Sequence, residues 1–183
     1  NGRTDPSLYT RHVSLQDAAG HVLDTESTKI GFRTFKVSNG KAYLNGKQIE
    51  IHGVGYHQDR EGVGNAVSRD QMAQDIDTML DMGVNAVRTS HYPHDPAFYE
   101  MADEKGLLVY CEIPYYLIYS KADSYKNSIT NQLTEMIRQG YNYPSIVMWG
   151  VQNEVRYSEQ FASYGPDFKV TEDELVAFNS ALV

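Results

Sequence analysis

The residues best placed to do chemistry are Asn153 and Glu154, which follow a short apolar run at 145–149. The run Ser-Ile-Val-Met-Trp predicts a buried strand, and α/β folds place their catalytic groups just past the carboxyl ends of such strands. Glutamate is seldom buried unless it is paired. A carboxyl group on this rim could donate a proton to the leaving oxygen of a glycoside, while a second carboxylate attacks the anomeric carbon.

Further polar side chains follow the ends of three earlier predicted strands: His52 and His57, then Arg88, Ser90, His91 and His94, then Glu112. We expect His52 to be a hydrogen-bonded core residue and His94 to be a solvated turn residue. Arg88 could neutralise Glu112 on the neighbouring strand, which is compatible with a functional role. His57 and His91 could share a metal ion, but their spacing matches no compact zinc motif, and we predict no metal.

Strands alternate with helices from residue 49 onward, as parallel βαβ units require. A capping box at Ser68–Gln71 begins one helix, and Asp95-Pro96 begins the next. The remaining predicted elements are strands at 48–53, 84–88, 107–111 and 145–149, a helix at 125–139, and a helix that begins near Thr171. Four such units fit half of a (β/α)8 barrel or an open doubly wound sheet. Nucleotide binding, which is common in open sheets, loses its main support because the chain contains no G-x-G-x-x-G or P-loop sequence.

The first 38 residues predict β structure without helices. Residues 8–15 and 21–24 alternate like a hairpin, and residues 30–37 alternate with period two. Asn39-Gly40 and Asn45-Gly46 then flank a short strand. Two or three strands cannot close a sandwich. We therefore expect this segment to belong to a larger β domain.

The composition argues against some partners. The 183 residues carry a formal net charge of -8, which disfavours binding to nucleic acid and to anionic membranes, and no apolar stretch could span a bilayer. The only cysteine, Cys111, follows an apolar run and is expected to be a buried structural thiol. The 14 tyrosines suit sugar recognition, although most are expected to pack with their hydroxyls at the surface. No residue determines the compartment, and we expect the cytoplasm.

Two long motifs resemble signatures of glycoside hydrolase family 2. Residues 85–93, Asn-Ala-Val-Arg-Thr-Ser-His-Tyr-Pro, resemble its first signature, and residues 142–154, which end in Trp-Gly-Val-Gln-Asn-Glu, resemble its acid/base signature. Residues 31–33, Gly-Phe-Arg, are similar to the junction between that family's immunoglobulin-like β-sandwich and its catalytic barrel. Residues 44–57 resemble the start of the first barrel strand. The resemblance covers about residues 8–154. It implies that residues 1–38 are the last strands of a β-sandwich domain and that residues 39–183 are the first half of a TIM barrel.

The resemblance implies a role for each matching residue. Glu154 corresponds to the general acid/base, and Asn153 corresponds to the asparagine that hydrogen-bonds the 2-hydroxyl of the sugar. His57 and His91 correspond to histidines that line the sugar subsite. Arg88 corresponds to the arginine that supports the nucleophile and keeps it ionised.

Two departures from the family pattern limit these expectations. The family's nucleophile is a glutamate on the seventh barrel strand, which lies outside this chain. Glu112 is not expected to replace it, and we expect an ion pair or a hydrogen bond there instead. Some galactosidases of the family hold magnesium with an acid and a histidine after the third strand. Residues 113–119 contain neither, so we predict no cofactor and no metal.

The resemblance thus implies a retaining hydrolase of terminal β-linked sugars. Residues 149–154 favour a β-galactosidase over a β-glucuronidase or a β-mannosidase, and a non-catalytic carbohydrate-binding module is the alternative from another class. The expected partners are a carbohydrate substrate and the remainder of the same polypeptide. Half a barrel leaves two open sheet edges, so we expect either a homo-oligomer or further residues of the same polypeptide to cover them. The chain alone is expected to be inactive, since one carboxylate cannot carry out a double displacement.

Overall fold

The computed structural model describes residues 6–156 and 159–183, and a four-stranded parallel sheet lies at its centre. Its strands are β6 (Gly53–Tyr56), β7 (Ala86–Thr89), β8 (Leu108–Glu112) and β10 (Ile146–Gly150). They lie in the order β10-β8-β7-β6, so strands that follow one another along the chain are also neighbours in space. This is the arrangement of the first half of a (β/α)8 barrel, and it confirms the predicted α/β fold.

Helices α1 (Arg69–Asp81), α2 (Pro96–Lys105) and α3 (Asp123–Gly140) connect these strands, and α4 (Glu172–Ala181) follows the last of them. The predicted capping box at Ser68 and the Asp95 cap are both present. One core cluster joins Val87 and Val109 of the sheet to Ile76, Phe98 and Ile129 of the first three helices. None of the helices in the described part of the chain is long and apolar enough to cross a membrane.

The first barrel strand lies later in the chain than the sequence predicts. Residues 48–53 were expected to form it, whereas Lys47–Ile49 form β5 and the barrel strand is Gly53–Tyr56. The cause is the turn at Asn45-Gly46, which directs residues 47–49 back along β4 (Lys41–Leu44) in an antiparallel pair. Asn45 and Gly46 have φ angles of 50° and 78°, as a type I′ hairpin turn requires.

The alternating segment 30–37 is also not one strand. Strand β2 (Val22–Ile30) ends where the segment begins, and β3 (Phe35–Ser38) forms its last part. Gly31 lies against Pro144, where a Cβ atom would come within 2.8 Å of the proline Cγ. The Arg33 side chain donates hydrogen bonds to the carbonyl oxygens of Pro144 and Ile146. Contacts with the barrel therefore interrupt the strand.

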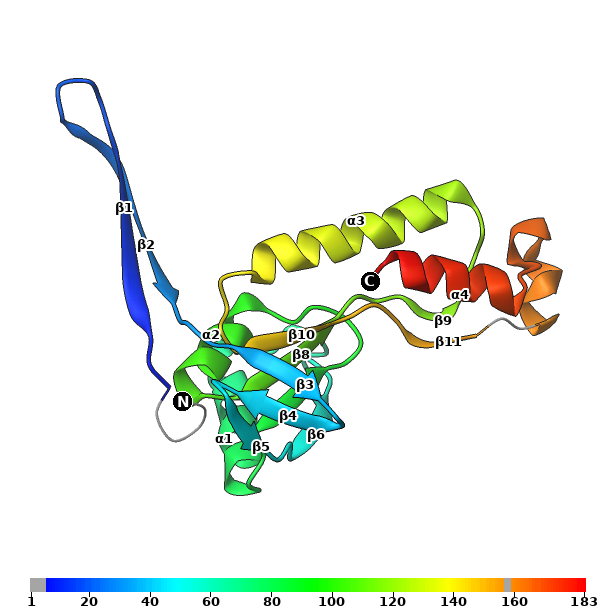
Figure 1. Cartoon of the computed structure of the whole chain (residues 1–183), viewed down its shortest axis with the longest axis horizontal. Helices are drawn as coiled ribbons and strands as arrows, with labels where there is room; N and C mark the ends of the chain where they lie inside the picture. The colour runs from blue at the N-terminus through cyan, green and yellow to red at the C-terminus, as the bar shows by residue number, and fades with distance from the viewer. Residues whose placement is uncertain (1–5, 157–158) are drawn as a thin grey trace.

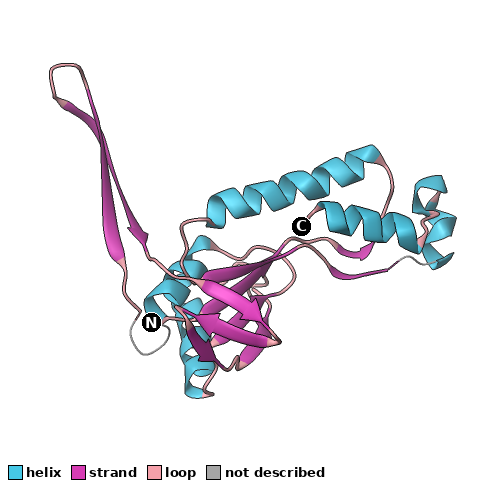
Figure 2. Cartoon of the chain, viewed as in Figure 1, coloured by secondary structure: helices cyan, strands magenta, loops and turns pink. Residues whose placement is uncertain are grey.

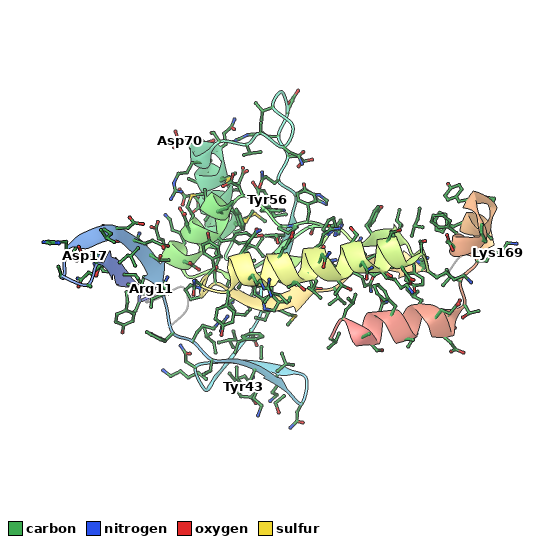
Figure 3. All side chains as sticks on the ribbon, turned by 90° about the horizontal axis from the view of Figure 1, so that it is seen from above. Arg11, Asp17, Tyr43, Tyr56, Asp70 and Lys169 are labelled. Atoms are coloured by element: carbon green, nitrogen blue, oxygen red, sulfur yellow. The ribbon has the colours of Figure 1, made fainter. Side chains whose placement is uncertain are left out.

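Strands β3, β4 and β5 form a small antiparallel sheet, from which Tyr43 projects in Figure 3. The predicted domain boundary between residues 38 and 39 falls at the turn between its first two strands. Upstream, β1 (Tyr9–Gln16) and β2 form a hairpin that projects from the rest of the molecule (Figure 1). Its apolar residues, such as Leu15 and Leu23, are 62% and 63% exposed. The assignment of residues 1–38 to a larger β-sandwich stays a prediction.

A second parallel pair, which the sequence analysis does not predict, extends beyond the barrel sheet. Strand β9 (Tyr116–Ile118) pairs with β11 (Asn153–Arg156), and the 3-10 helices Glu159–Tyr164 and Pro166–Phe168 follow. This pair lies on the side of the molecule away from the β1–β2 hairpin, and the long helix α3 runs from the central sheet toward it (Figures 1 and 2). The pair places Asn153 and Glu154 within a strand rather than in a loop.

Candidate active site

Glu112, the last residue of β8, is the centre of a polar network at the carboxyl edge of the sheet. Its side chain has no exposed surface. One carboxylate oxygen accepts hydrogen bonds from Arg88 Nε at 3.0 Å and from an Arg88 Nη at 2.7 Å. The other oxygen lies 2.6 Å from His91 Nδ1, which donates to it. A buried carboxylate needs such partners, and the predicted ion pair of Glu112 is confirmed.

Arg88 lies on the face of the sheet opposite to the helices. Its neighbours along the strand, Val87 and Thr89, are buried on the helix side, so the two-residue alternation of a strand directs Arg88 to the barrel interior. The guanidinium lies over the ring of Tyr110, which is the residue paired with Arg88 on β8, at 5.5 Å from the ring centroid. This cation–π contact fixes the orientation of the guanidinium.

Gly150 allows this arrangement because it has no side chain. A Cβ atom built on Gly150 would lie 2.5 Å from the Tyr110 hydroxyl oxygen and 2.6 Å from Glu112 Cβ. Both distances are far shorter than ordinary van der Waals contact. Glycine at the end of β10 is therefore needed for Tyr110 and Glu112 to occupy these positions.

Asn153 joins the same network from β11. Its Oδ1 accepts a hydrogen bond from an Arg88 Nη at 2.8 Å, and its backbone N–H donates to the carbonyl oxygen of Tyr115 at 2.8 Å. The residue is only 6% exposed. Its Nδ2 atom is buried and has no hydrogen-bond partner among the described residues. Asn153 thus presents a buried N–H donor in a fixed orientation, since Arg88 already binds its carbonyl oxygen.

Glu154 is exposed and has a φ angle of 51°, which is uncommon for a residue with a side chain. The β9–β11 register shifts between Asn153 and Arg156, so Glu154 lies in an irregular part of the strand. Such backbone strain is concentrated at functional sites. Glu154 is attached to the network through its chain neighbour Asn153.

His57 and His91 approach each other from two different loops. Their ring centroids are 5.0 Å apart with the planes at 83°, and His57 also contacts the ring of Tyr92 at 6.0 Å. His91 follows a cis peptide bond after Ser90. The structure therefore brings together four of the predicted site residues in one continuous set of contacts, namely His57, His91, Arg88 and Asn153.

Two histidines differ from their predicted environments. His52 was expected in the core, but its side chain is 64% exposed. The first barrel strand begins at Gly53, so His52 lies just outside it. His94 was expected in solvent, but it is 5% exposed among the rings of Tyr56, Tyr92 and Phe98. Burial lowers the pKa of His94 to about 4, so this ring is neutral near pH 7.

The sequence analysis missed two aromatic residues of the network, Tyr110 and Tyr116. Tyr110 lies two residues before Glu112 on the same strand, so strand periodicity could have placed it on the interior face. Tyr116 stacks on His91, with the ring centroids 5.9 Å apart and the planes at 8°. No sequence signal marks Tyr116, because its position depends on the pairing of β9 with β11.

The network does not resemble a metal centre. In residues 6–156 and 159–183, no group of three or more His, Cys, Asp or Glu side chains is arranged to hold a metal ion. The segment after the third barrel strand contains β9, Tyr-Leu-Ile, which offers no carboxylate and no imidazole. The residues present therefore do not fit the magnesium site of some galactosidases. Cys111 is 1% exposed, and burial raises the pKa of its thiol, as expected for a structural cysteine.

The fold and the network together define the first half of a TIM-barrel domain with a polar site at its carboxyl edge. A sequence profile described as glycosyl hydrolases family 2, TIM barrel domain, matches residues 35–179. The chain therefore belongs to glycosyl hydrolase family 2, as the two motifs imply.

The similar proteins include two of the three kinds of glycosidase that the motifs leave open. The chain is 37% identical over 179 residues to a β-galactosidase of Priestia megaterium, covering 90% of this chain and 17% of that protein. It is 38% identical over 164 residues to a β-glucuronidase of Bacteroides fragilis, covering 85% of this chain and 24% of that protein. The chain thus spans less than a quarter of the length of these relatives.

Solved structures agree with the fold. β-Glucuronidase 3 of Bacteroides uniformis superimposes with a TM-score of 0.84 at 34% identity, covering 99% of this chain and 22% of that chain. The likeness covers nearly all of this chain and therefore supports the fold described above.

Proposed function

We propose that this chain forms the acid/base half of the active site of a retaining β-glycosidase. Asn153 is the observation that carries the proposal. Arg88 holds its carbonyl oxygen at 2.8 Å, while its buried Nδ2 donor has no partner among the described residues. A sugar hydroxyl beside Glu154 would satisfy this donor, and a buried unsatisfied N–H is otherwise costly.

In the proposed mechanism Glu154 acts twice. It first donates a proton to the glycosidic oxygen as the bond to the anomeric carbon breaks and a carboxylate attacks that carbon. It then takes a proton from the water that displaces this carboxylate, so the configuration at the anomeric carbon is retained. The exposed position of Glu154 is compatible with both steps, because leaving group and water must reach the same carboxyl group. We assign the attacking carboxylate to the remainder of the polypeptide.

The preferred substrate in this proposal is a β-galactoside. Arg88 supplies the guanidinium of the network that includes Glu112, Asn153 and the two histidines. Its positive charge is already paired with Glu112. A β-glucuronide carries a carboxylate, which requires a further cation. A neutral sugar suits this half of the site better, and the relative from Priestia megaterium supports it.

A β-glucuronidase is the second candidate, and the likeness to the solved structure from Bacteroides uniformis favours it. In that case the cation would come from the second half of the barrel. Location in the cytoplasm and assembly into a homo-oligomer, both expected from the sequence, also stay proposals.

The experiment compares hydrolysis of nitrophenyl β-galactoside and nitrophenyl β-glucuronide by the complete polypeptide. Glu154→Gln should lower kcat/KM by about 10²–10⁴-fold, since the leaving oxygen loses its proton donor. Glu154→Gln should slow the bond-breaking step less with dinitrophenyl glycosides, because their leaving groups need little protonation. Glu172→Gln, an exposed acid on α4, is the matched control and should retain full activity.

Two results would contradict the proposal. One is an unchanged rate in Glu154→Gln with both substrates. The other is turnover by the 183-residue chain alone, which should show none. If that turnover disappears in Glu154→Gln, both carboxylates lie within this chain.

A further inference from the structure

Tyr116 is an exposed aromatic ring that lies among the proposed sugar-contacting residues. It is 47% exposed, and its ring is stacked nearly parallel to that of His91. We propose that Tyr116 is a stacking platform that binds the apolar C–H face of the terminal pyranose ring. This inference rests on the proposed function, because it concerns the same site.

The pairing of β9 with β11 places Tyr116 beside Asn153. The two residues are partners in the parallel register, and the backbone N–H of Asn153 donates to the carbonyl oxygen of Tyr115. Paired residues of neighbouring strands direct their side chains to the same face of the sheet. A sugar hydroxyl that accepts a hydrogen bond from Asn153 Nδ2 would therefore belong to a ring within reach of Tyr116.

The Tyr116 ring is held in place before any ligand binds. His91, on which it stacks, is fixed by its 2.6 Å hydrogen bond to Glu112, and Glu112 is bound by Arg88. Arg88 in turn holds Asn153, which pairs with Tyr116. The contacts thus form a closed ring of residues. A binding surface that is already ordered loses little conformational entropy when the ligand binds.

The contrast with Tyr115 argues against a purely structural role for Tyr116. Tyr115 is fully buried and contacts the rings of Tyr125 and Phe178, so it is a core residue. Tyr116 points to the other side of the strand and leaves almost half of its surface exposed. Amphipathic aromatic rings suit this use, because a flat apolar face can cover sugar C–H groups while the hydroxyl stays in water.

The test measures galactose binding to the complete polypeptide by saturation-transfer NMR, together with KM and kcat for nitrophenyl β-galactoside. The variants are Tyr116→Ala, Tyr116→Leu and Tyr116→Phe. The matched control is Tyr141→Ala, which removes a 76% exposed tyrosine after α3, at the opposite edge of the sheet. Circular dichroism shows whether each variant is folded.

Tyr116→Ala and Tyr116→Leu should raise KM and weaken galactose binding by roughly 5- to 30-fold, which corresponds to the loss of one aromatic contact. Tyr116→Phe should keep the wild-type KM, because it keeps the ring. The leucine variant preserves apolar volume on His91, so it tests the platform even if the alanine variant does not fold. Tyr141→Ala should bind galactose like the wild type.

Unchanged galactose binding in Tyr116→Leu would overturn the proposal. A fall in kcat at constant KM would also overturn it, because Tyr116 would then act only by supporting His91. If the wild-type polypeptide binds galactose but hydrolyses no glycoside, the proposed catalytic function fails, while the binding measurements still decide the role of Tyr116.

Discussion

Replacing Glu112 by glutamine removes one charge from the polar network and nearly preserves the volume of the side chain. The buried carboxylate of Glu112 accepts hydrogen bonds from both Arg88 and His91. Glutamine keeps one acceptor oxygen, but its amide group would face one of these two donors. The guanidinium of Arg88 would also lose its counter-charge.

The expected cost follows from the burial of the two partners. Breaking a buried ion pair by removing one partner costs about 3–5 kcal/mol. The side chain of Arg88 is 38% exposed, so water recovers part of this cost. We expect Glu112→Gln to lower the free energy of unfolding by about 2–3 kcal/mol. The matched control is Glu104→Gln, which breaks a surface pair with Lys29. The two side chains of that pair are 41% and 60% exposed, and such pairs contribute about 0–1 kcal/mol.

Urea unfolding of the 183-residue chain measures both variants through the fluorescence of Trp149, its single tryptophan. Trp149 pairs with Cys111, the residue before Glu112, so its signal reports on this part of the sheet. The reasoning is refuted if the two variants lose the same free energy. It is also refuted if Glu112→Gln is as stable as the wild type.

Two further predictions concern stability. Gly150→Ala should lower the free energy of unfolding by about 1–3 kcal/mol, because its Cβ would overlap with Tyr110. The control is Gly55→Ala, whose Cβ meets only Ser90 Oγ at 3.4 Å. In the same unfolding assay it should change the free energy of unfolding by less than about 0.5 kcal/mol. Burial raises the pKa of Asp103 from 3.8 to about 6, so its contribution to stability is present at pH 4 and is lost as the pH rises to about 6. His94 has the opposite sign, since its pKa is lowered from 6.5 to about 4 and its contribution is lost as the pH falls through that range. Between pH 4 and 6.5, the slope of the unfolding free energy against pH should therefore be more positive in Asp103→Asn than in the wild type, and more negative in His94→Gln. Each group should account for at most about 3 kcal/mol over this range. Parallel pH profiles for all three proteins would contradict this assignment.

Local signals account for most of the elements that the sequence predicts correctly. The capping box at Ser68 and the Asp95-Pro96 start of α2 depend on residues three or fewer positions apart, and both are present. The turns at Asn39-Gly40 and Asn45-Gly46 are equally local, because their positive φ angles favour these residue types. The first barrel strand was misplaced because residues 47–49 could pair either with the hairpin or with the barrel, and their own sequence does not distinguish the two.

The environments of single side chains are less predictable. His94 was expected in solvent because it precedes a helix cap, yet rings from β6 and α2 enclose it. Asn153 and Glu154 are adjacent in sequence, yet one is buried in the network and the other is exposed. Both outcomes depend on residues far away along the chain, which no local pattern contains.

The amino-acid sequence by itself determined the family and the alternation of strands and helices, and it predicts His57, Arg88, His91, Asn153 and Glu154 as site residues. These properties depend on residue type and spacing, which are present before the chain folds. Only the tertiary structure decided that Glu112 lies at the centre of the site, that Gly150 makes room for it, and that Tyr116 stacks on His91. These contacts join strands that are dozens of residues apart, and they exist only once the parallel sheet has brought the carboxyl ends of those strands together.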